Sequence, residues 1–210
     1  MLGLFYKDNI QMLRTGRIFL IVGVLFLVMS VISPETLFYT FNPCIMISMV
    51  FPVTAMSFDE SEKWNVFCLT TSVTRRQYVH AKYLLHLFWT LILLAATSGA
   101  LLIRMIIHHA FIASDFLTLL PTMLTLSLGM PVFLYPFIFR YGVEKGRIVY
   151  MVLIGAATAA GILILNRSDF AQSAGAEMST MPLLAAAGIA AVLYALSWFL
   201  SLSLYEKREF

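Results

Sequence analysis

Few residues in this 210-residue chain could do chemistry, and many of them fall in one stretch, Trp64–Lys82, which reads WNVFCLTTSVTRRQYVHAK. None of them forms a known catalytic pattern. The chain has no Gly-Lys pair, so it lacks the phosphate-binding loop with which P-loop ATPases hold ATP. It also lacks a His-x-x-x-His pair, a Gly-x-Ser-x-Gly motif and paired acids within its apolar segments. The sequence therefore predicts no ATPase, no membrane protease and no carboxylate-based proton relay.

The composition is that of an integral membrane protein. Hydrophobic residues make up 60% of the chain and charged residues 12%, whereas soluble domains are nearer half apolar and a quarter charged. The pI near 8.9 does not indicate nucleic-acid binding, because the basic residues gather on no soluble domain. Cys44 and Cys68 form no CxxC pair and no metal-ligand cluster. We expect them on opposite sides of the bilayer, as small apolar residues.

The apolar segments predict helices, since none shows the alternation of a barrel strand. A helix needs about 20 apolar residues to cross a bilayer, and six segments meet or approach that length in a single all-α transmembrane domain, residues 1–210. The fourth segment carries Pro121, Pro131 and Pro136, which membrane bundles tolerate where neighbouring helices satisfy the freed backbone groups. The predicted spans are Ile18–Ile32, Pro43–Phe58, Leu84–Ile103, Phe116–Phe139, Ile148–Leu165 and Pro182–Leu204.

Basic residues gather on one side of these six segments. Twelve of the fourteen lysines and arginines precede the first segment, follow the sixth, or lie between the second and third or the fourth and fifth. Only Arg104 and Arg167 lie on the other side. Basic loops stay in the cytoplasm, so both termini are predicted to be cytoplasmic in a multi-pass protein of the cell membrane. The first span resembles a signal peptide, but no A-x-A site follows it, and we expect it to remain uncleaved.

The first seventeen residues have the pattern of an amphipathic helix. Leu2, Phe5, Tyr6 and Leu13 lie on a broad apolar face, with polar and charged residues elsewhere. A helix in the cytoplasmic membrane interface fits this pattern. A frayed basic tail is the alternative.

The loop after the second span predicts a short cytoplasmic helix, Glu60–Leu69. Asp59 is placed to cap this helix, and Glu62 completes a pattern like a capping box. Acids in the first turn also suit the positive end of the helix dipole. Spacings of three and four residues place an apolar group on one face of the helix. That group consists of Trp64, Phe67 and Cys68.

A second helix is predicted to follow, because Thr74-Arg75-Arg76-Gln77 has the form of a capping box. Val73 and Tyr78 are placed as a hydrophobic staple, and the helix continues through Lys82 into the third span. The loop is thus a short separate helix followed by a basic elbow. From the residues alone, two interpretations stay open. The helix rests on lipid with its arginines on phosphates, or it docks on a cytoplasmic protein partner.

Three cytoplasmic segments resemble the type-2 permeases of ABC transporters, in particular the small six-span bacterial kind. The run TSVTRRQYVHAKYL is similar to the pattern that follows the second span in that family, and the matching residues extend from Val73 to Tyr83. Thr71 and Ser72 depart from the usual Leu-Pro. The segments YGVEKGR, Tyr141–Arg147, and SLSLYEKREF, Ser201–Phe210, also resemble family segments and occur in the same order.

The resemblance implies a membrane-spanning permease subunit of an exporter in a bacterial cell membrane. Its implied partners are a cytoplasmic ATP-binding subunit, which carries ATP and Mg, a second permease copy or paralogue, and membrane lipid. No cofactor is expected on this chain, and the cargo is expected to be amphipathic or apolar, such as a peptide or antibiotic. The segment Glu60–Leu69 would be the coupling helix, with Trp64 and Phe67 as anchors. The residues implied to contact the ATP-binding subunit are Glu60, Glu62, Trp64, Phe67, Cys68, Arg75 and Arg76, with Gly142, Glu144, Lys145 and Arg147 in the second cytoplasmic loop.

Arg104 is the candidate residue for the cargo pathway, since it would attract an anionic group on the outer side. The alternative is that it snorkels to the outer interface. The neighbouring His108 and His109 point to different helix faces and do not predict a metal site. Two other classes of function remain as rivals, a membrane scaffold or regulator without transport and a secondary transporter. The latter usually has buried acids or inverted repeats, and the sequence shows neither.

Overall fold

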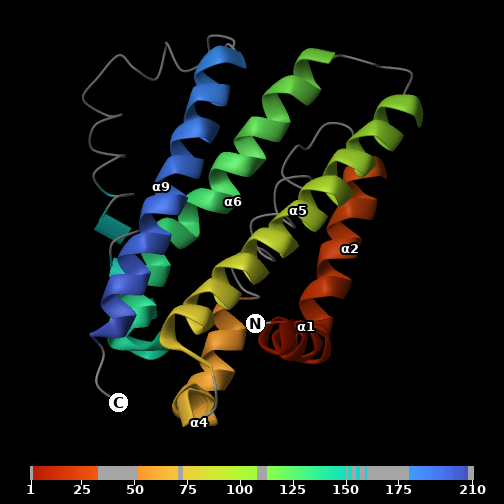
Figure 1. Cartoon of the computed structure of the whole chain (residues 1–210). Helices are drawn as coiled ribbons and strands as arrows, with labels where there is room; N and C mark the ends of the chain where they lie inside the picture. Colours follow the sequence, from red (N-terminus) through yellow and green to blue (C-terminus); the bar gives the residue numbers. More distant parts are fainter. Residues whose placement is uncertain are drawn as a thin grey trace.

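The computed structural model of the chain describes residues 2–32, 52–70, 73–107, 113–149, 151–152, 155–156, 159 and 180–207. The regular elements in these ranges are all helical, which confirms the predicted all-α class. Residues 52–61 and 143–149 form two short helices. The labelled helices in Figure 1 are α1 (Leu2–Thr15), α2 (Arg17–Ile32), α4 (Trp64–Thr70), α5 (Arg75–Ile107), α6 (Ala113–Tyr141) and α9 (Thr180–Glu206).

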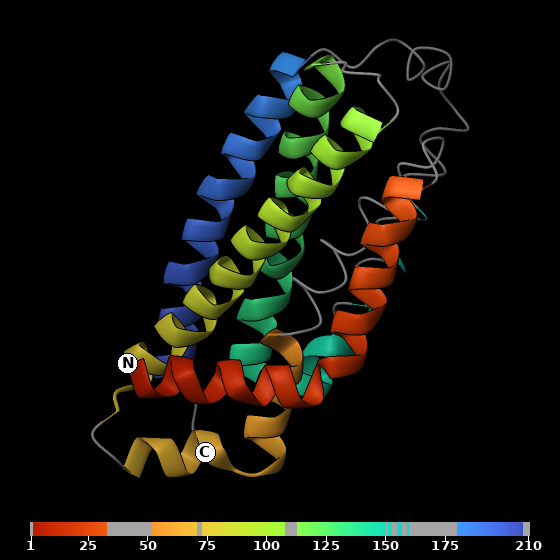
Figure 2. The same cartoon turned by 90° about the vertical axis from the view of Figure 1, so that its right-hand side faces the viewer.

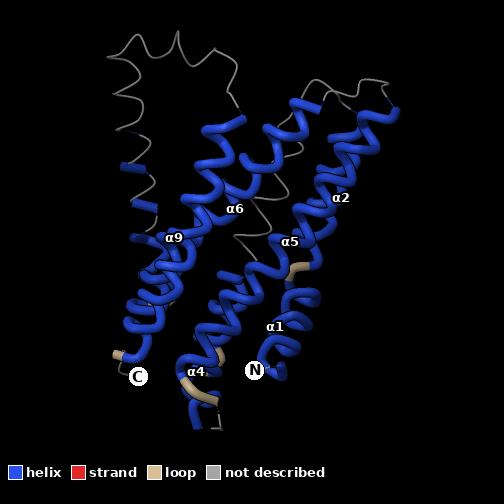
Figure 3. The backbone as a smooth tube through the Cα atoms, turned by 45° about the horizontal axis from the view of Figure 1, so that its top comes forward, coloured by secondary structure: helices blue, strands red, loops and turns tan. Residues whose placement is uncertain are grey.

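Three long helices form the body of the molecule. α6 and α9 pack side by side along much of their length, and α5 contacts both of them and also α2 (Figure 3). Apolar side chains nevertheless remain on the outside, including Ile106 at 71% and Phe199 at 70% exposure. Large apolar surfaces of this kind mark contact with a membrane or a partner. α5, α6 and α9 are each long and apolar enough to cross a bilayer.

The first two helices are joined by a sharp bend at Gly16. α1 and α2 meet at 71°, and together they count as a fourth candidate span. α1 lies across one end of the bundle, whereas α2 runs along it (Figure 2). The structure thus has a helix where the sequence predicts an interfacial one. The position of α1 at a membrane surface stays a prediction.

The predicted count of six spans also stays a prediction. Three or four spans are present in the described part of the chain. Most of the second predicted span, Pro43–Phe58, and most of the fifth, Ile148–Leu165, lie outside the described residues, and so does Cys44.

The three prolines of α6 lie inside an unbroken helix, as predicted. Each proline removes the N–H that would bond the carbonyl four residues earlier. For Pro136 that carbonyl belongs to Val132, and Ser197 of α9 donates a hydrogen bond to it at 2.8 Å. The neighbouring helix therefore satisfies the backbone group that the proline leaves open.

A polar cluster joins α5 to α9 inside the bundle. The Tyr83 hydroxyl lies 2.9 and 2.8 Å from the hydroxyls of Ser197 and Ser201. Tyr194 donates to the backbone carbonyl of Tyr83 at 3.0 Å, and its hydroxyl lies 2.9 Å from Nδ1 of His86. Because buried polar groups in an apolar medium need partners, these contacts fix the register between the two helices.

Candidate functional site

The helix predicted over Glu60–Leu69 is two elements in the structure. The helix 52–61 ends in a turn, in which the backbone N–H of Glu62 donates to the Phe58 carbonyl at 3.0 Å and that of Lys63 to the Glu60 carbonyl at 3.2 Å. Lys63 has a φ of 53°, in the left-handed region. α4 then begins at Trp64 and ends at Thr70. The expected start at Glu60 is therefore wrong, and Glu62 lies in the turn rather than in a first helical turn.

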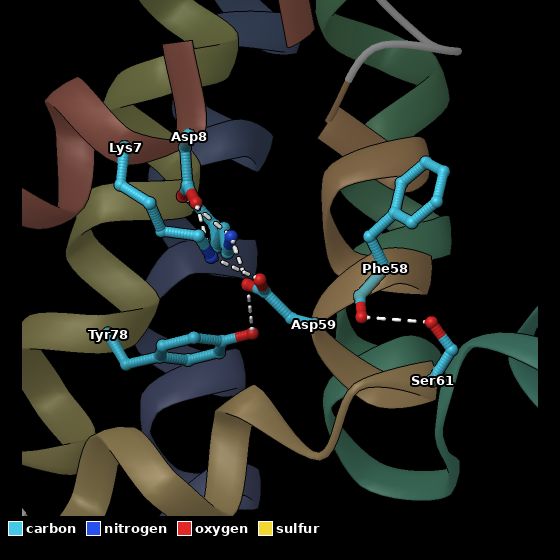
Figure 4. A network of polar contacts seen from close by, with 7 residues as sticks. Lys7, Asp8, Phe58, Asp59, Ser61 and Tyr78 are labelled. Atoms are coloured by element: carbon cyan, nitrogen blue, oxygen red, sulfur yellow. Dashed lines mark hydrogen bonds and ion pairs between the residues drawn. The ribbon is translucent and has the colours of Figure 1, made fainter. Parts of the chain in front are cut away.

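Asp59 does not cap a helix, because its carboxylate is used elsewhere. It lies inside the helix 52–61 and is 1% exposed. Its Oδ2 accepts hydrogen bonds from Lys82 Nζ at 2.6 Å and from the Tyr78 hydroxyl at 3.0 Å. Its Oδ1 pairs with Lys7. Figure 4 shows Lys7 and Tyr78 converging on Asp59 from different elements.

Asp8 of α1 completes a buried ion-pair network. Lys82 Nζ lies 2.6 Å from Asp8 Oδ2, and both side chains have no exposed surface. Lys7 Nζ lies 3.2 Å from Asp8 Oδ1 and is the one partly exposed member, at 30%. Two lysines and two aspartates give the network no net charge. The network, defined here as Lys7, Asp8, Asp59, Tyr78 and Lys82, joins α1, the helix 52–61 and α5.

The network shifts the titration of its central acid. Burial alone would raise the pKa of the Asp59 carboxyl, but the charges and hydrogen bonds of Lys82 and Lys7 outweigh burial and hold the pKa below its ordinary value of 3.8. Removing one member of a buried ion pair leaves an uncompensated charge and commonly costs about 3–5 kcal/mol. Because its pKa is lowered, Asp59 is ionised at neutral pH. Its ion pairs and those of Asp8 fix the relative positions of three helical elements.

The apolar face of α4 divides differently from the sequence prediction. Cys68 is 2% exposed and belongs to the core that also contains Tyr78 and Leu134. Trp64 is half-buried against the same core, and Lys7 Nζ lies 4.7 Å from the centre of its ring. Phe67 is 57% exposed. Phe67 is therefore the more exposed aromatic side chain of α4, and the role of Trp64 as the leading anchor stays a prediction.

The second cytoplasmic segment is held against the first by Glu60. Its carboxylate accepts a hydrogen bond from the backbone N–H of Val143 at 2.5 Å, at the start of the helix 143–149. Gly142 has a φ of 91°, and a Cβ on it would collide with the Glu60 carboxylate. A cleft of about 440 Å³ lies beside this contact. The residues that line it are Ser57, Glu60, Ser61, Tyr141, Gly142, Val143, Glu144 and Lys145.

The basic elbow is anchored to the end of α9. Arg75 Nη1 donates to the carbonyl of Glu206 at 2.7 Å, and Arg76 Nε lies 2.6 Å from its carboxylate. The predicted capping box is confirmed, since Thr74 Oγ1 accepts from the N–H of Gln77 at 3.3 Å and Gln77 Oε1 accepts from the N–H of Thr74 at 3.2 Å. Both arginines thus contact Glu206, and Arg76 remains largely exposed.

The structure brings together part of the predicted contact set. Glu60 and Gly142 meet directly, and α4 lies below the same end of the bundle (Figure 2). Glu62, Glu144, Lys145 and Arg147 are exposed around that end. Sequence reasoning assigned no role to Lys7 or Asp8 and saw Lys82 only as a family match. Their signal was the presence of charged residues on segments predicted to be helical.

Arg104 lies at the far end of α5 from this network. Its side chain is 8% exposed, which disfavours the interpretation that it snorkels to an interface. Nη1 has no hydrogen-bond partner, and no acid pairs with Arg104 among the side chains that the structure describes, which do not include those of residues 108–116. This buried cation differs in that respect from Lys82.

Long apolar helices with outward-facing side chains define a multi-pass membrane protein. A comparison with protein families matches residues 3–206 to the ABC-2 family transporter protein. The chain belongs to this family, whose members are membrane components of transporters. No curated protein and no solved structure matches the chain.

Proposed function

We propose that this chain is the permease subunit of an ATP-driven exporter and that α4 docks on a separate cytoplasmic ATP-binding subunit. ABC-2 permeases usually work with such a subunit. The sequence has no phosphate-binding loop, so ATP and Mg would be held by the partner. Two permeases, this chain and a second copy or a paralogue, would share the complex in a cell membrane.

The observation that carries the proposal is the position of α4. It is a separate seven-residue helix beyond the end of the bundle, displaced from the long helices (Figures 1 and 2). Its exposed Phe67 ring lies 5.3 Å from the ring of Trp64. An exposed aromatic side chain supported by a half-buried one is typical of the anchors that dominate protein interfaces.

The surroundings of α4 favour a role in transmitting motion. The helix 52–61, which precedes α4 by two residues, contacts α1 and α5 through Asp59 and the segment 142–149 through Glu60. A displacement of α4 by ATP binding would therefore act on several elements at once. The cargo is proposed from the family resemblance alone, as an amphipathic or apolar compound such as a peptide or antibiotic.

A substitution at Phe67 tests the docking role. Phe67→Ala should reduce co-purification of the ATP-binding subunit, or uncouple its ATP hydrolysis from cargo, since truncating an interface anchor commonly costs about 2 kcal/mol or more. Phe199→Ala is the matched control, because Phe199 is 70% exposed on α9, away from α4. The measurement is pull-down of a protein identified by its P-loop, together with its cargo-stimulated ATP turnover.

Equal ATPase recovery and equal coupling for the two variants would contradict the docking assignment. A wild-type chain that captures no P-loop protein from its native membrane would favour a scaffold or regulator without transport.

The orientation of the chain is tested by cysteine labelling. The excess of basic residues on one side predicts that Ser61 and Lys63, both exposed, lie in the cytoplasm. In a Cys-free background, Ser61→Cys and Lys63→Cys should resist an impermeant thiol reagent added to intact cells. Thr36→Cys and Ser173→Cys, at positions outside the described residues, should react. The reversed pattern would place α4 on the outer side, where no ATP-binding subunit could reach it.

A further inference from the structure

α5 carries five buried polar side chains on one face, interspersed with apolar ones, and they are called the stripe here. At 100° per residue, these positions fall within an arc of about 80° on the helix. Each of them is at most 8% exposed. Buried polar residues in a membrane segment are costly, and they commonly mark a functional path. The stripe consists of Lys82, His86, Thr90, Thr97 and Arg104.

Four members of the stripe have partners within the chain. Lys82 pairs with Asp8 and Asp59. His86 lies 2.9 Å from the Tyr194 hydroxyl and 3.3 Å from that of Thr90.

Thr97 bonds its own helix, donating to the Leu93 carbonyl at 2.8 Å. These four positions are therefore internally satisfied, and they need no ligand in this conformation.

Arg104 is the exception. It is more than nine-tenths buried, and its Nη1 has no hydrogen-bond partner in the structure described above. A guanidinium is always charged and offers five donors suited to an oxyanion. A buried cation without a counter-charge is unfavourable, and an anion supplied from outside the chain would remove that cost.

The depth of Arg104 restricts the kind of ligand. Arg104 lies 22 positions after Lys82 on one continuous helix, which corresponds to about 33 Å. This distance is close to the roughly 30 Å thickness of a hydrocarbon core. If Lys82 lies near one boundary of the core, Arg104 lies near the other, where phospholipid phosphates and the polar ends of amphipathic molecules are found.

We propose that Arg104 forms a binding site for an oxyanion carried on an apolar tail. Two sources have this chemistry, the phosphate of an anionic phospholipid and the carboxylate or phosphate of a cargo molecule. The apolar tail is inferred from the exposed apolar side chains of Ile103 and Ile107, which lie within one turn of Arg104 on α5. Assigning the anion to cargo rests on the proposed export function, whereas the binding site itself does not.

The test uses the full-length chain, purified alone in a neutral detergent without any ATP-binding subunit. The melting temperature is measured with added phosphatidylglycerol or octanoate. Octanol and diacylglycerol, which have similar tails and no charge, are the ligand controls. Because no ATPase is present, this experiment can fail while the Phe67 result stands, and the reverse also holds.

The wild-type chain should be stabilised by the anionic probes and not by the neutral ones. Arg104→Gln should melt at a higher temperature than the wild type in the absence of probe, because it removes an uncompensated buried charge, and should no longer respond. Arg104→Lys should respond at concentrations about tenfold higher, since lysine keeps the charge and loses the planar fork. Arg14→Gln, which removes an exposed arginine of α1, should respond as the wild type does.

The source of the anion follows from the probes. A response to phosphatidylglycerol alone identifies a bound lipid, and an equal response to octanoate identifies a site open to acidic cargo. The proposal is overturned if neither anion stabilises the wild type, or if Arg104→Gln responds undiminished. It is also overturned if Arg104→Gln lowers the melting temperature or fails to fold, because Arg104 would then be a structural residue with a partner in the chain.

Discussion

Each end of the buried stripe on α5 carries a buried cation, but the two cations differ in their acidic partners. Lys82 has no exposed surface and lies between two aspartates from α1 and from the helix 52–61. Arg104 is 8% exposed and has no counter-charge among the side chains that the structure describes. The chain thus closes one end of the stripe with its own acids and leaves the other end for an anion from outside.

The comparison shows that burial alone does not tell a structural charge from a binding one. The ion pairs of Lys82 join three elements of the chain and neutralise its charge. Lys82 therefore needs no ligand. Around Arg104 no described side chain compensates the buried charge, which favours a functional interpretation. A structural charge and a ligand-binding charge are therefore told apart by their ion-pair partners and not by their burial.

Removing the lysine at the paired end should have the largest effect. Lys82→Met leaves Asp8 and Asp59 buried with Lys7 as their only lysine partner, and the free energy of unfolding should fall by about 3–5 kcal/mol. The check is thermal or detergent-denaturant unfolding of the purified chain. Tyr78→Phe, which removes only one hydroxyl donor from Asp59, should cost about 1 kcal/mol and serves as the control for loss of a neutral contact.

A charge-balanced double variant makes this prediction sharper. Adding Asp8→Asn to Lys82→Met removes one positive and one negative charge, so much of the lost stability should return. If the double variant is as unstable as the sum of its single variants, Lys82 acts through packing of its alkyl chain. The contrast with Arg104 would then disappear, because acids of the chain would not stabilise either cation.

A smaller effect is expected from acid. The pKa of Asp59 is below 3.8 in the folded chain, so its contribution to stability is fully present above that pH and is lost as the pH falls through the folded value. The melting-temperature difference between wild type and Asp59→Asn should stay constant from pH 7 to about 5 and shrink below about 4. A difference that persists unchanged to pH 3 would show that Asp59 does not act as a carboxylate.

Local rules predicted the local features of this molecule. The capping box at Thr74 and Gln77 lies within three residues, and its two hydrogen bonds form as expected. The prolines of α6 lie inside a helix as expected. Apolar length alone was enough to predict the three long helices α5, α6 and α9, each of which is a candidate span.

The errors have one cause, competition from distant partners. Asp59 has the spacing of a helix cap, but Lys82 and Lys7, 23 and 52 positions away, bind its carboxylate more strongly than a helix end would. Glu60 is used by Val143, 83 positions away, rather than by its own helix. A single sequence contains no measure of these long-range pairings.

The separation of Asp8 from Lys82 also sets an order on biosynthesis. The two residues lie 74 positions apart, and at 5–20 residues per second a ribosome takes roughly 4–15 s to make the intervening chain. During this interval Asp8 has Lys7 as a neighbour, but Lys82, its buried partner in the folded chain, does not yet exist. α1 therefore reaches its final place across the end of the bundle only after the start of α5 has been synthesised, and insertion of the first helices precedes their locking.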